Sequence, residues 1–180
     1  RDALKPENYE TAWYPYQLTF DVNYPQSGIH MHGKDFFHDE HTVVRLLKIT
    51  PSQAKRILAG TLHITGRSPG LSRTAGADRH VVQFADDEYE CAIGLFRPQG
   101  DALAAVPVRI TPDCGMDLWR AAIPLLPEPQ HLAIVVAMAT RQEGSQKALE
   151  RIKAITKIDG IAGSLARRKA FWDDYLKHAP

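Results

Sequence analysis

The sequence predicts a mainly β protein, an antiparallel β-sandwich followed by two C-terminal helices. Short β-branched and apolar segments recur at about ten-residue spacing with turn residues between them, which is the pattern of a sandwich or barrel rather than of βαβ units. After residue 140 the apolar residues change to helical spacing. We therefore divide the chain into a β-sandwich domain at residues 1–140 and a helical linker segment at residues 141–180.

The clearest strand is expected over residues 17–24. Leu18, Phe20 and Val22 alternate with polar residues, and a period of two over such a segment indicates a half-buried strand. The segment Pro25-Gln26-Ser27-Gly28 then supplies the residue types that form turns.

The later strands are predicted from β-branched and apolar segments bounded by turn residues. They cover residues 41–49, 59–65, 80–85, 89–96, 103–110, 118–126 and 131–140. The acidic residues 86–88 suit a hairpin turn, and residues 67–78, rich in Gly, Ser and Arg, are expected to form a loop. The series amounts to about eight to ten strands.

Two helices are expected after the strands. Ser145 is predicted to cap the first, which runs from about residue 146 to 158. Its apolar positions at helical spacing are Leu149, Ile152 and Ile155. Asp159-Gly160 is predicted to break it, and the second helix covers residues 161–178.

The second helix carries aromatic residues on more than one side. Its apolar arc contains Ala162, Leu165, Trp172, Tyr175 and Leu176. Phe171 falls outside that arc, among polar residues. An aromatic residue in that position indicates a second packing partner for the helix, so Phe171 and Trp172 are candidate interface residues.

Composition and charge exclude several classes of protein. Apolar residues make up 44% and charged residues 24%, as in ordinary globular domains. With 22 basic and 21 acidic residues, the charge balance gives no case for a nucleic acid or an anionic membrane as partner. The apolar run Leu132–Ala139 is too short to cross a bilayer.

The cysteines and the N-terminus bear on the compartment. Cys91 and Cys114 either form one disulfide in an oxidising compartment or remain two separate thiols, and the sequence leaves both open. No Cys-x-x-Cys motif is present, which argues against a cysteine-based zinc site. The first fifteen residues contain no apolar secretory segment. We favour a periplasmic or secreted location slightly over a cytoplasmic one.

Four of the eight histidines lie within residues 30–41. On a strand, His30 and His32 point to the same face and could present two imidazoles to one metal ion. The nearby residues that could complete the coordination shell are His38, Asp39, Glu40 and His41. The His-x-His-Gly string is similar to one copper motif of multicopper oxidases, and cupins carry His-x-His on a strand, but the further motifs of both are absent. The alternative is a polar strand with solvated histidines, and we expect no cofactor.

No catalytic residue can be assigned. The carboxylates of residues 86–88 suit an exposed turn, and Asp173-Asp174 suits the polar side of a helix. The sequence contains no Gly-x-Ser-x-Gly elbow, no P-loop and no Gly-x-Gly-x-x-Gly motif. The chain by itself is therefore expected not to be catalytic.

Aromatic residues form the remaining candidate site. Trp13, Tyr14 and Tyr16 cluster just before the first clear strand, and Trp119 lies in a late strand. Aromatic faces of this kind stack on sugar rings, so these four residues are candidates for carbohydrate contact. The alternative is that they pack in the core and at the edges of the sandwich.

The order of segments at the end of the chain resembles a known domain junction. The apolar strand His131–Thr140 leads into the polar segment 141–144, then into a helix rich in Ala, Leu and Lys, and then into the segment Arg167–Leu176. This order resembles the junction in bacterial glycoside hydrolases and phosphorylases of the (α/α)6-barrel, six-hairpin glycosidase-like type. In that family an N-terminal β-supersandwich precedes a helical linker whose Trp is followed by bulky apolar residues, as Trp172 is by Tyr175 and Leu176. The segment 33–37 before a β-branched strand also suits the early strands of that sandwich.

The resemblance implies a function for the chain as part of a larger assembly. The catalytic carboxylates of the family lie in the barrel, so the chain is expected to be a non-catalytic sandwich domain that packs on a downstream (α/α)6 catalytic domain and shapes the rim of its sugar site. Two alternatives remain open: a stand-alone carbohydrate-binding module that uses Trp13 and Trp119, and a small metal-dependent β-barrel enzyme that uses His30 and His32.

Overall fold

The structure is a computed structural model that describes residues 7–51, 61–69, 73–75, 81–85, 87–113, 116–144, 146–155 and 158–178. Within these residues the chain forms two antiparallel sheets, a short 3₁₀ helix at Arg141–Glu143 and two α-helices. The strands are β1 (Asn8–Tyr14), β2 (Gln17–Tyr24), β3 (Ile29–Phe37), β4 (Thr42–Pro51), β5 (Thr61–Pro69), β6 (Arg73–Ala75), β7 (Val81–Ala85), β8 (Tyr89–Gln99), β9 (Ala102–Ala105), β10 (Val108–Asp113), β11 (Met116–Pro124) and β12 (Gln130–Thr140). The helices are α1 (Lys147–Ala154) and α2 (Ile158–His178). The predicted fold class, mainly β with two C-terminal helices, is confirmed.

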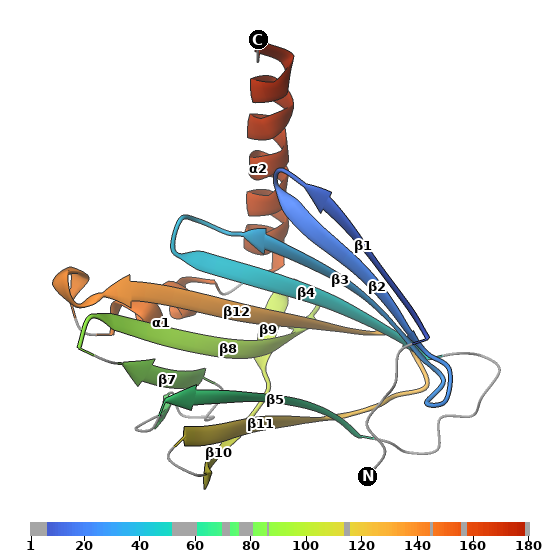
Figure 1. Cartoon of the computed structure of the whole chain (residues 1–180), viewed down its shortest axis with the longest axis horizontal. Coiled ribbons are helices and arrows are strands. Elements are labelled where there is room, and N and C mark those ends of the chain that lie inside the picture. The colour runs from blue at the N-terminus through green and yellow to red at the C-terminus, as the bar shows by residue number, and fades with distance from the viewer. Residues whose placement is uncertain are drawn as a thin grey trace.

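The larger sheet has nine described strands in the order β1-β2-β3-β4-β12-β8-β7-β6, with β9 paired to β8 (Figure 1). The first four strands are joined in sequence as antiparallel neighbours. β12 comes last along the chain but lies in the middle of the sheet, between β4 and β8. The larger sheet therefore consists of two antiparallel groups of strands, one from β1 to β4 and one from β6 to β9, and β12 joins them.

The smaller sheet, in the order β10-β11-β5, covers part of one face of the larger sheet. Alternate residues of the larger sheet, such as Ile49, Leu95 and Leu132, are buried against Trp119 and Ile123 of β11. When two sheets pack face to face, every second side chain of a strand is buried between them, as is seen here. The two layers and the apolar core between them make the predicted sandwich.

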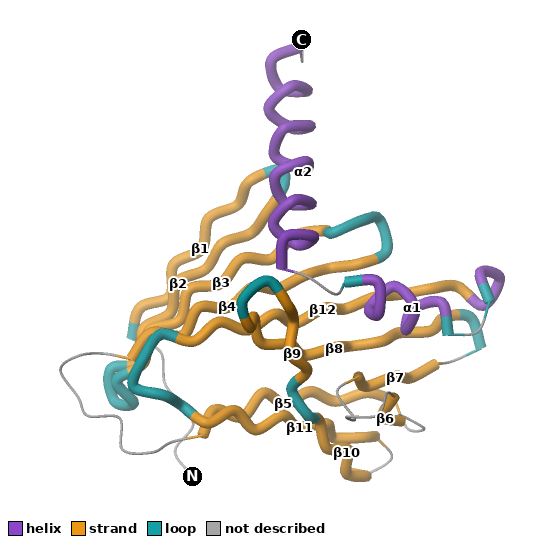
Figure 2. Tube along the Cα trace, turned by 180° about the vertical axis from the view of Figure 1, so that it is seen from behind, coloured by secondary structure: helices purple, strands orange, loops and turns teal. Residues whose placement is uncertain are grey.

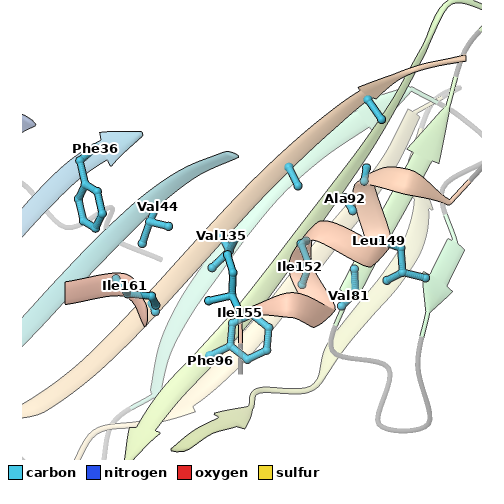
Figure 3. Close-up of a cluster of buried hydrophobic side chains, with 14 residues drawn as sticks. Phe36, Val44, Val81, Ala92, Phe96, Val135, Leu149, Ile152, Ile155 and Ile161 are labelled. Carbon is cyan, nitrogen blue, oxygen red and sulfur yellow. The ribbon is translucent and has the colours of Figure 1, made fainter. Parts of the chain in front are cut away.

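Helix α1 covers the opposite face of the larger sheet, over β8 and β12 (Figures 2 and 3). Leu149 and Ile152 of α1 are buried in one cluster with Ala92 and Val135 of the sheet. Gly94 allows the close approach, because a Cβ there would lie 3.0 Å from Cγ2 of Ile152.

The start of α1 is fixed by a buried carboxylate. Glu90 of β8 accepts hydrogen bonds from Nε2 of Gln83, at 2.5 Å, and from the backbone N–H of Gln146, at 2.6 Å. Gln146 precedes the helix with a φ of 69°, in the left-handed region. The predicted cap, Ser145, lies outside the described residues.

Helix α2 is anchored to the sheet at its start and projects beyond it along most of its length (Figures 1 and 2). Ile161 is buried in the same cluster as α1 (Figure 3). Leu165 is partly buried and packs against that cluster. Ser164 is buried and its Oγ lies 2.5 Å from Nδ1 of His38, in the turn after β3. No described helix is apolar over a stretch long enough for a membrane span.

Several predicted boundaries are wrong. The expected strand 103–110 is two strands, because the chain passes Pro107, which has no N–H to donate, and changes sheet: β9 pairs with β8 and β10 pairs with β11. The expected loop 67–78 contains the end of β5 and all of β6. Asp159-Gly160 does not break a helix but lies in the first turn of α2.

Candidate functional site

The candidate site is a cleft between the tip of the β1–β2 hairpin and α2, which we call the aromatic cleft. It has a volume of about 380 Å³. Its lining residues are Trp13 to Leu18 of the hairpin, Asp35, Phe36 and Phe37 of β3, Val43 of β4, and Arg168 and Trp172 of α2. The cleft therefore collects four of the six predicted aromatic candidates, Trp13, Tyr14, Tyr16 and Trp172.

The hairpin presents its aromatic residues through a tight connection. Tyr14 of β1 pairs directly with Gln17 of β2, so that Pro15 and Tyr16 form the turn between them. The rings of Tyr14 and Tyr16 are stacked, with centroids 5.7 Å apart and an interplanar angle of 24°. Trp13 is 80% exposed. One wall of the cleft is thus a set of accessible aromatic rings.

The opposite wall comes from α2. Trp172 and Arg168 lie one helical turn apart and therefore on one side of the helix. Trp172 contacts Phe171 and Tyr175 edge to face, with ring centroids 5.7 and 5.4 Å apart. These contacts restrict the indole, so the wall has a defined surface.

The contact between Ser164 and His38 holds the base of α2 beside the cleft. The hydroxyl of Ser164 also lies 2.9 Å from the carbonyl oxygen of Gly160. Burial lowers the pKa of His38, and the positive charges of Arg167 and Arg168 lower it further, while Asp39 opposes them. The imidazole is therefore held toward its neutral form.

The charged groups in and beside the cleft have different partners. Asp35 accepts two hydrogen bonds from Arg45, from Nε to Oδ1 at 2.7 Å and from Nη2 to Oδ2 at 2.5 Å. This bond raises the pKa of Arg45, whose guanidinium also lies 5.2 Å from the ring of Phe20. Among the described residues no ion pair engages Arg168.

The described lining of the cleft does not contain the pair of carboxylates that glycoside hydrolysis uses. Glycosidic cleavage by paired carboxylates needs two such groups about 5–10 Å apart. Within the described lining Asp35 is the one carboxylate, and both of its oxygens are bonded to Arg45. The accessible faces of Trp13 and Trp172 can instead stack on a sugar ring or receive a bulky side chain.

The two other aromatic candidates lie outside the cleft. Trp119 is only 8% exposed and packs between the sheets over Gly66, so the structure places it in the core rather than at a glycan surface. Its Nε1 is buried, and none of the described residues is a hydrogen-bond partner for it. Phe171 is 63% exposed on α2 and stacks on Tyr175, with centroids 6.5 Å apart.

The histidine pair lies elsewhere on the larger sheet and contacts one carboxylate. Nε2 of His30 is 2.6 Å from Oδ1 of Asp21, and Nδ1 of His32 is 2.7 Å from Oδ2. These hydrogen bonds lower the pKa of Asp21, with the contact to His32 contributing most. No group of three or more His, Cys, Asp or Glu side chains in the described part of the chain is arranged to hold a metal ion.

The remaining residues of the histidine segment do not converge on that pair. His38 contacts Ser164, and Nε2 of His41 lies 3.3 Å from Oε1 of Glu40. Cys91 lies on β8, where burial raises the pKa of its thiol to about 11. The thiol of Cys91 is free, and Cys114 lies outside the described residues.

Neither Arg168 nor Phe37 was predicted to be part of a site. Arg168 precedes Trp172 by four residues, and that spacing was the available signal that both residues face one way. Phe37 is exposed at the end of β3, and no pattern in the sequence relates it to the β1–β2 hairpin.

Comparison with known proteins supports the fold. No protein-family model matches the chain, and no curated protein matches it in sequence. Two solved structures of heparinase III, the first with methylated lysines, are similar to 76% and 78% of the chain, with TM-scores of 0.53 and 0.55 and 11% sequence identity. The chain spans about a fifth of these proteins, 22% of each. The sequence resemblance pointed to glycoside hydrolases and phosphorylases, whereas these neighbours carry the name of a heparinase.

Proposed function

We propose that the chain is a non-catalytic β-sandwich domain of a carbohydrate-active protein and packs on a separate catalytic domain. The observation that carries the proposal is the form of α2, which leaves the sandwich with Phe171, Tyr175 and Leu176 exposed. A projecting helix with large exposed apolar residues is typical of a surface that packs on a partner. The similarity of the fold to part of heparinase III favours a carbohydrate-active parent.

The proposal also specifies the fold of the catalytic domain on which the chain packs. The sequence resemblance favours an (α/α)6 barrel of a glycoside hydrolase or phosphorylase downstream of α2. In that arrangement Phe171 and Tyr175 pack on the barrel, and the neighbouring aromatic cleft lies near the sugar-binding rim. Placement of the catalytic groups in the partner agrees with the bonded state of Asp35 in this chain.

An activity screen of the purified chain tests the non-catalytic role. The substrates are glycosides and acidic and neutral polysaccharides, assayed for hydrolysis, phosphorolysis and eliminative cleavage. We expect no turnover above a heat-inactivated sample. Robust turnover that co-purifies with the chain through two unrelated columns would refute the proposal.

A second candidate function is direct carbohydrate binding by the aromatic cleft. The specific observation in its favour is that Trp13, Tyr14, Tyr16 and Trp172, which are far apart in the sequence, line one cavity. Stacking on aromatic side chains gives most of the contact area in such sites, and truncation of one ring removes much of it.

Titration of glycans against the chain, followed by calorimetry, tests this binding. Trp172→Ala is expected to weaken binding by about tenfold, which corresponds to about 1.4 kcal/mol and the loss of one aromatic contact. Leu176→Ala is the control, because Leu176 is exposed on the same helix but does not line the cleft. Equal affinities for the two variants and the parent chain would contradict a sugar site in the cleft.

A further inference from the structure

Strand β1 is an open edge of the larger sheet. It pairs with β2 through seven consecutive residue pairs, and the described residues place no strand on its other side. All seven of its residues are exposed. An edge strand of this length presents unpaired backbone N–H and C=O groups to any strand that can lie beside it.

The described edge strands β6, β5 and β10 carry features that discourage such pairing, and β1 does not. β6 is only three residues long, β5 ends in Pro69 and β10 contains Pro112. β1 has the sequence Asn-Tyr-Glu-Thr-Ala-Trp-Tyr, without Lys or Pro and with one charged residue, Glu10. Its regular register with β2 also contains no bulge.

The sequence of β1 is complementary to itself in one arrangement. When two copies run antiparallel with Thr11 at the centre, Tyr9 of each copy lies opposite Trp13 of the other, and Glu10 lies opposite Ala12. No like charges meet. A parallel pairing in register would place Glu10 opposite Glu10, so the antiparallel arrangement is favoured.

Exposure agrees with this arrangement. Tyr9 and Trp13 are 63% and 80% exposed, and with Thr11 they share one face of the strand because side chains alternate. Two copies would thus bring four exposed aromatic rings together around a central pair of threonines. Cross-strand aromatic pairs are among the favourable contacts between neighbouring strands.

We propose that the chain forms a symmetric homodimer in which β1 strands of two copies pair antiparallel about Thr11 and join the two larger sheets. Tyr9 of the second copy then lies beside Trp13 at the rim of the aromatic cleft. This inference does not rest on the proposed carbohydrate-related function, since it follows from the edge and register of β1.

Analytical ultracentrifugation of the chain over a range of concentrations is the first test. We expect a species with the mass of two chains, each 20.1 kDa. The variant Tyr9→Lys/Trp13→Lys places lysines opposite lysines and is expected to weaken self-association by about tenfold or more through loss of two aromatic pairs. The variant Tyr9→Lys/Trp13→Glu places lysine opposite glutamate and is expected to restore the dimer.

The control variant introduces two lysines in place of exposed aromatic residues of α2 instead of β1. Phe171→Lys/Tyr175→Lys on α2 is expected to leave the dimer intact. Dissociation of this variant, with the β1 variants still dimeric, would place the contact on α2 and overturn the proposal. The proposal would also be overturned if the folded parent chain stays monomeric at all concentrations. It would be overturned as well if the parent is dimeric but the folded variant Tyr9→Lys/Trp13→Glu remains monomeric.

A cross-linking experiment tests the register without relying on charge variants. Thr11→Cys, in a background with Cys91→Ser and Cys114→Ser, brings two thiols together at the two-fold axis. Mild oxidation is expected to give a covalent dimer with Thr11→Cys and little with Lys169→Cys, an exposed position on α2. Equal cross-linking at both positions would contradict the pairing of β1 strands about Thr11.

Discussion

Replacement of Gly66 by alanine is expected to destabilise the contact between the two sheets. Gly66 of β5 lies opposite Trp119 of β11, and the indole ring covers the glycine. A Cβ at this position would lie 2.1 Å from Cζ2 and 2.4 Å from Cε2 of Trp119. Carbon atoms pack at about 3.5–4.0 Å, so the ring must move by more than about 1 Å.

The cost follows from where the ring could go. Trp119 is 8% exposed and is surrounded by the apolar core, so a shift displaces its buried neighbours. Overpacking of this kind costs about 1–3 kcal/mol, and we expect the upper half of that range. For a chain of this size the melting temperature should fall by about 4–12 °C.

Urea unfolding followed by circular dichroism measures this change. Gly33→Ala is the matched control, because its Cβ would lie 2.0 Å from Cζ of Phe20, an equally close contact. Phe20 is only half-buried, however, so its ring can turn outward at the cost of its contact with Arg45. Gly66→Ala should therefore lower the free energy of unfolding more than Gly33→Ala does. In a Trp119→Leu background, Gly66→Ala should cost less than it does in the parent chain, because the ring that it meets is gone.

Two outcomes of the urea unfolding experiment would contradict this expectation. If Gly33→Ala destabilises the chain as much as Gly66→Ala, the difference in burial between Trp119 and Phe20 does not set the cost. If Gly66→Ala is neutral, the indole is not packed against β5 in solution.

Three further predictions concern titration and reactivity. Burial lowers the pKa of His38 below 6.5, so the unfolded chain binds the proton more readily than the folded chain does. The free energy of unfolding should therefore fall as the pH drops below about 6.5. In urea unfolding curves recorded over a pH series, His38→Gln should flatten that part of the dependence. Hydrogen bonds from the Thr140 N–H and from Arg151 lower the pKa of Glu143 from 4.5 to about 2. The stabilisation that the ionised carboxylate contributes should be complete above pH 4.5 and should disappear toward pH 2. Glu143→Gln should remove this dependence from the same pH series. Burial raises the pKa of the Cys91 thiol to about 11, so at pH 8 the thiol should react with a thiol reagent far more slowly in the folded chain than in urea. The two rates are measured in a Cys114→Ser variant, in which Cys91 is the remaining cysteine. Equal rates would contradict the burial of Cys91.

The regular strands could be predicted because their burial alternates with the sequence. Residues 17–24 form β2 with the predicted bounds, since the apolar residues of the segment share one face. β1 was missed because it is exposed on both faces and its sequence carries no such alternation. The order of strands could not be predicted either, because pairing between segments distant in the sequence leaves no local pattern.

The candidate site could be predicted only in part. Trp13, Tyr14 and Tyr16 are neighbours in the sequence, so their cluster was visible before the structure. The addition of Trp172 depends on the angle at which α2 leaves the sheet, which the contacts of Ile161 and Ser164 determine. Trp119 was indistinguishable from an exposed aromatic residue, because strand patterning does not reveal which face a second sheet will cover.

The central position of β12 has a consequence for synthesis on the ribosome. β1 to β4 and β7 to β8 can pair as separate hairpins while the chain emerges, but β12 must follow before they can form one sheet. Until then β4 and β8 are open edges, available to other nascent chains. A release of the chain before residue 130 should therefore yield aggregates rather than a smaller folded domain.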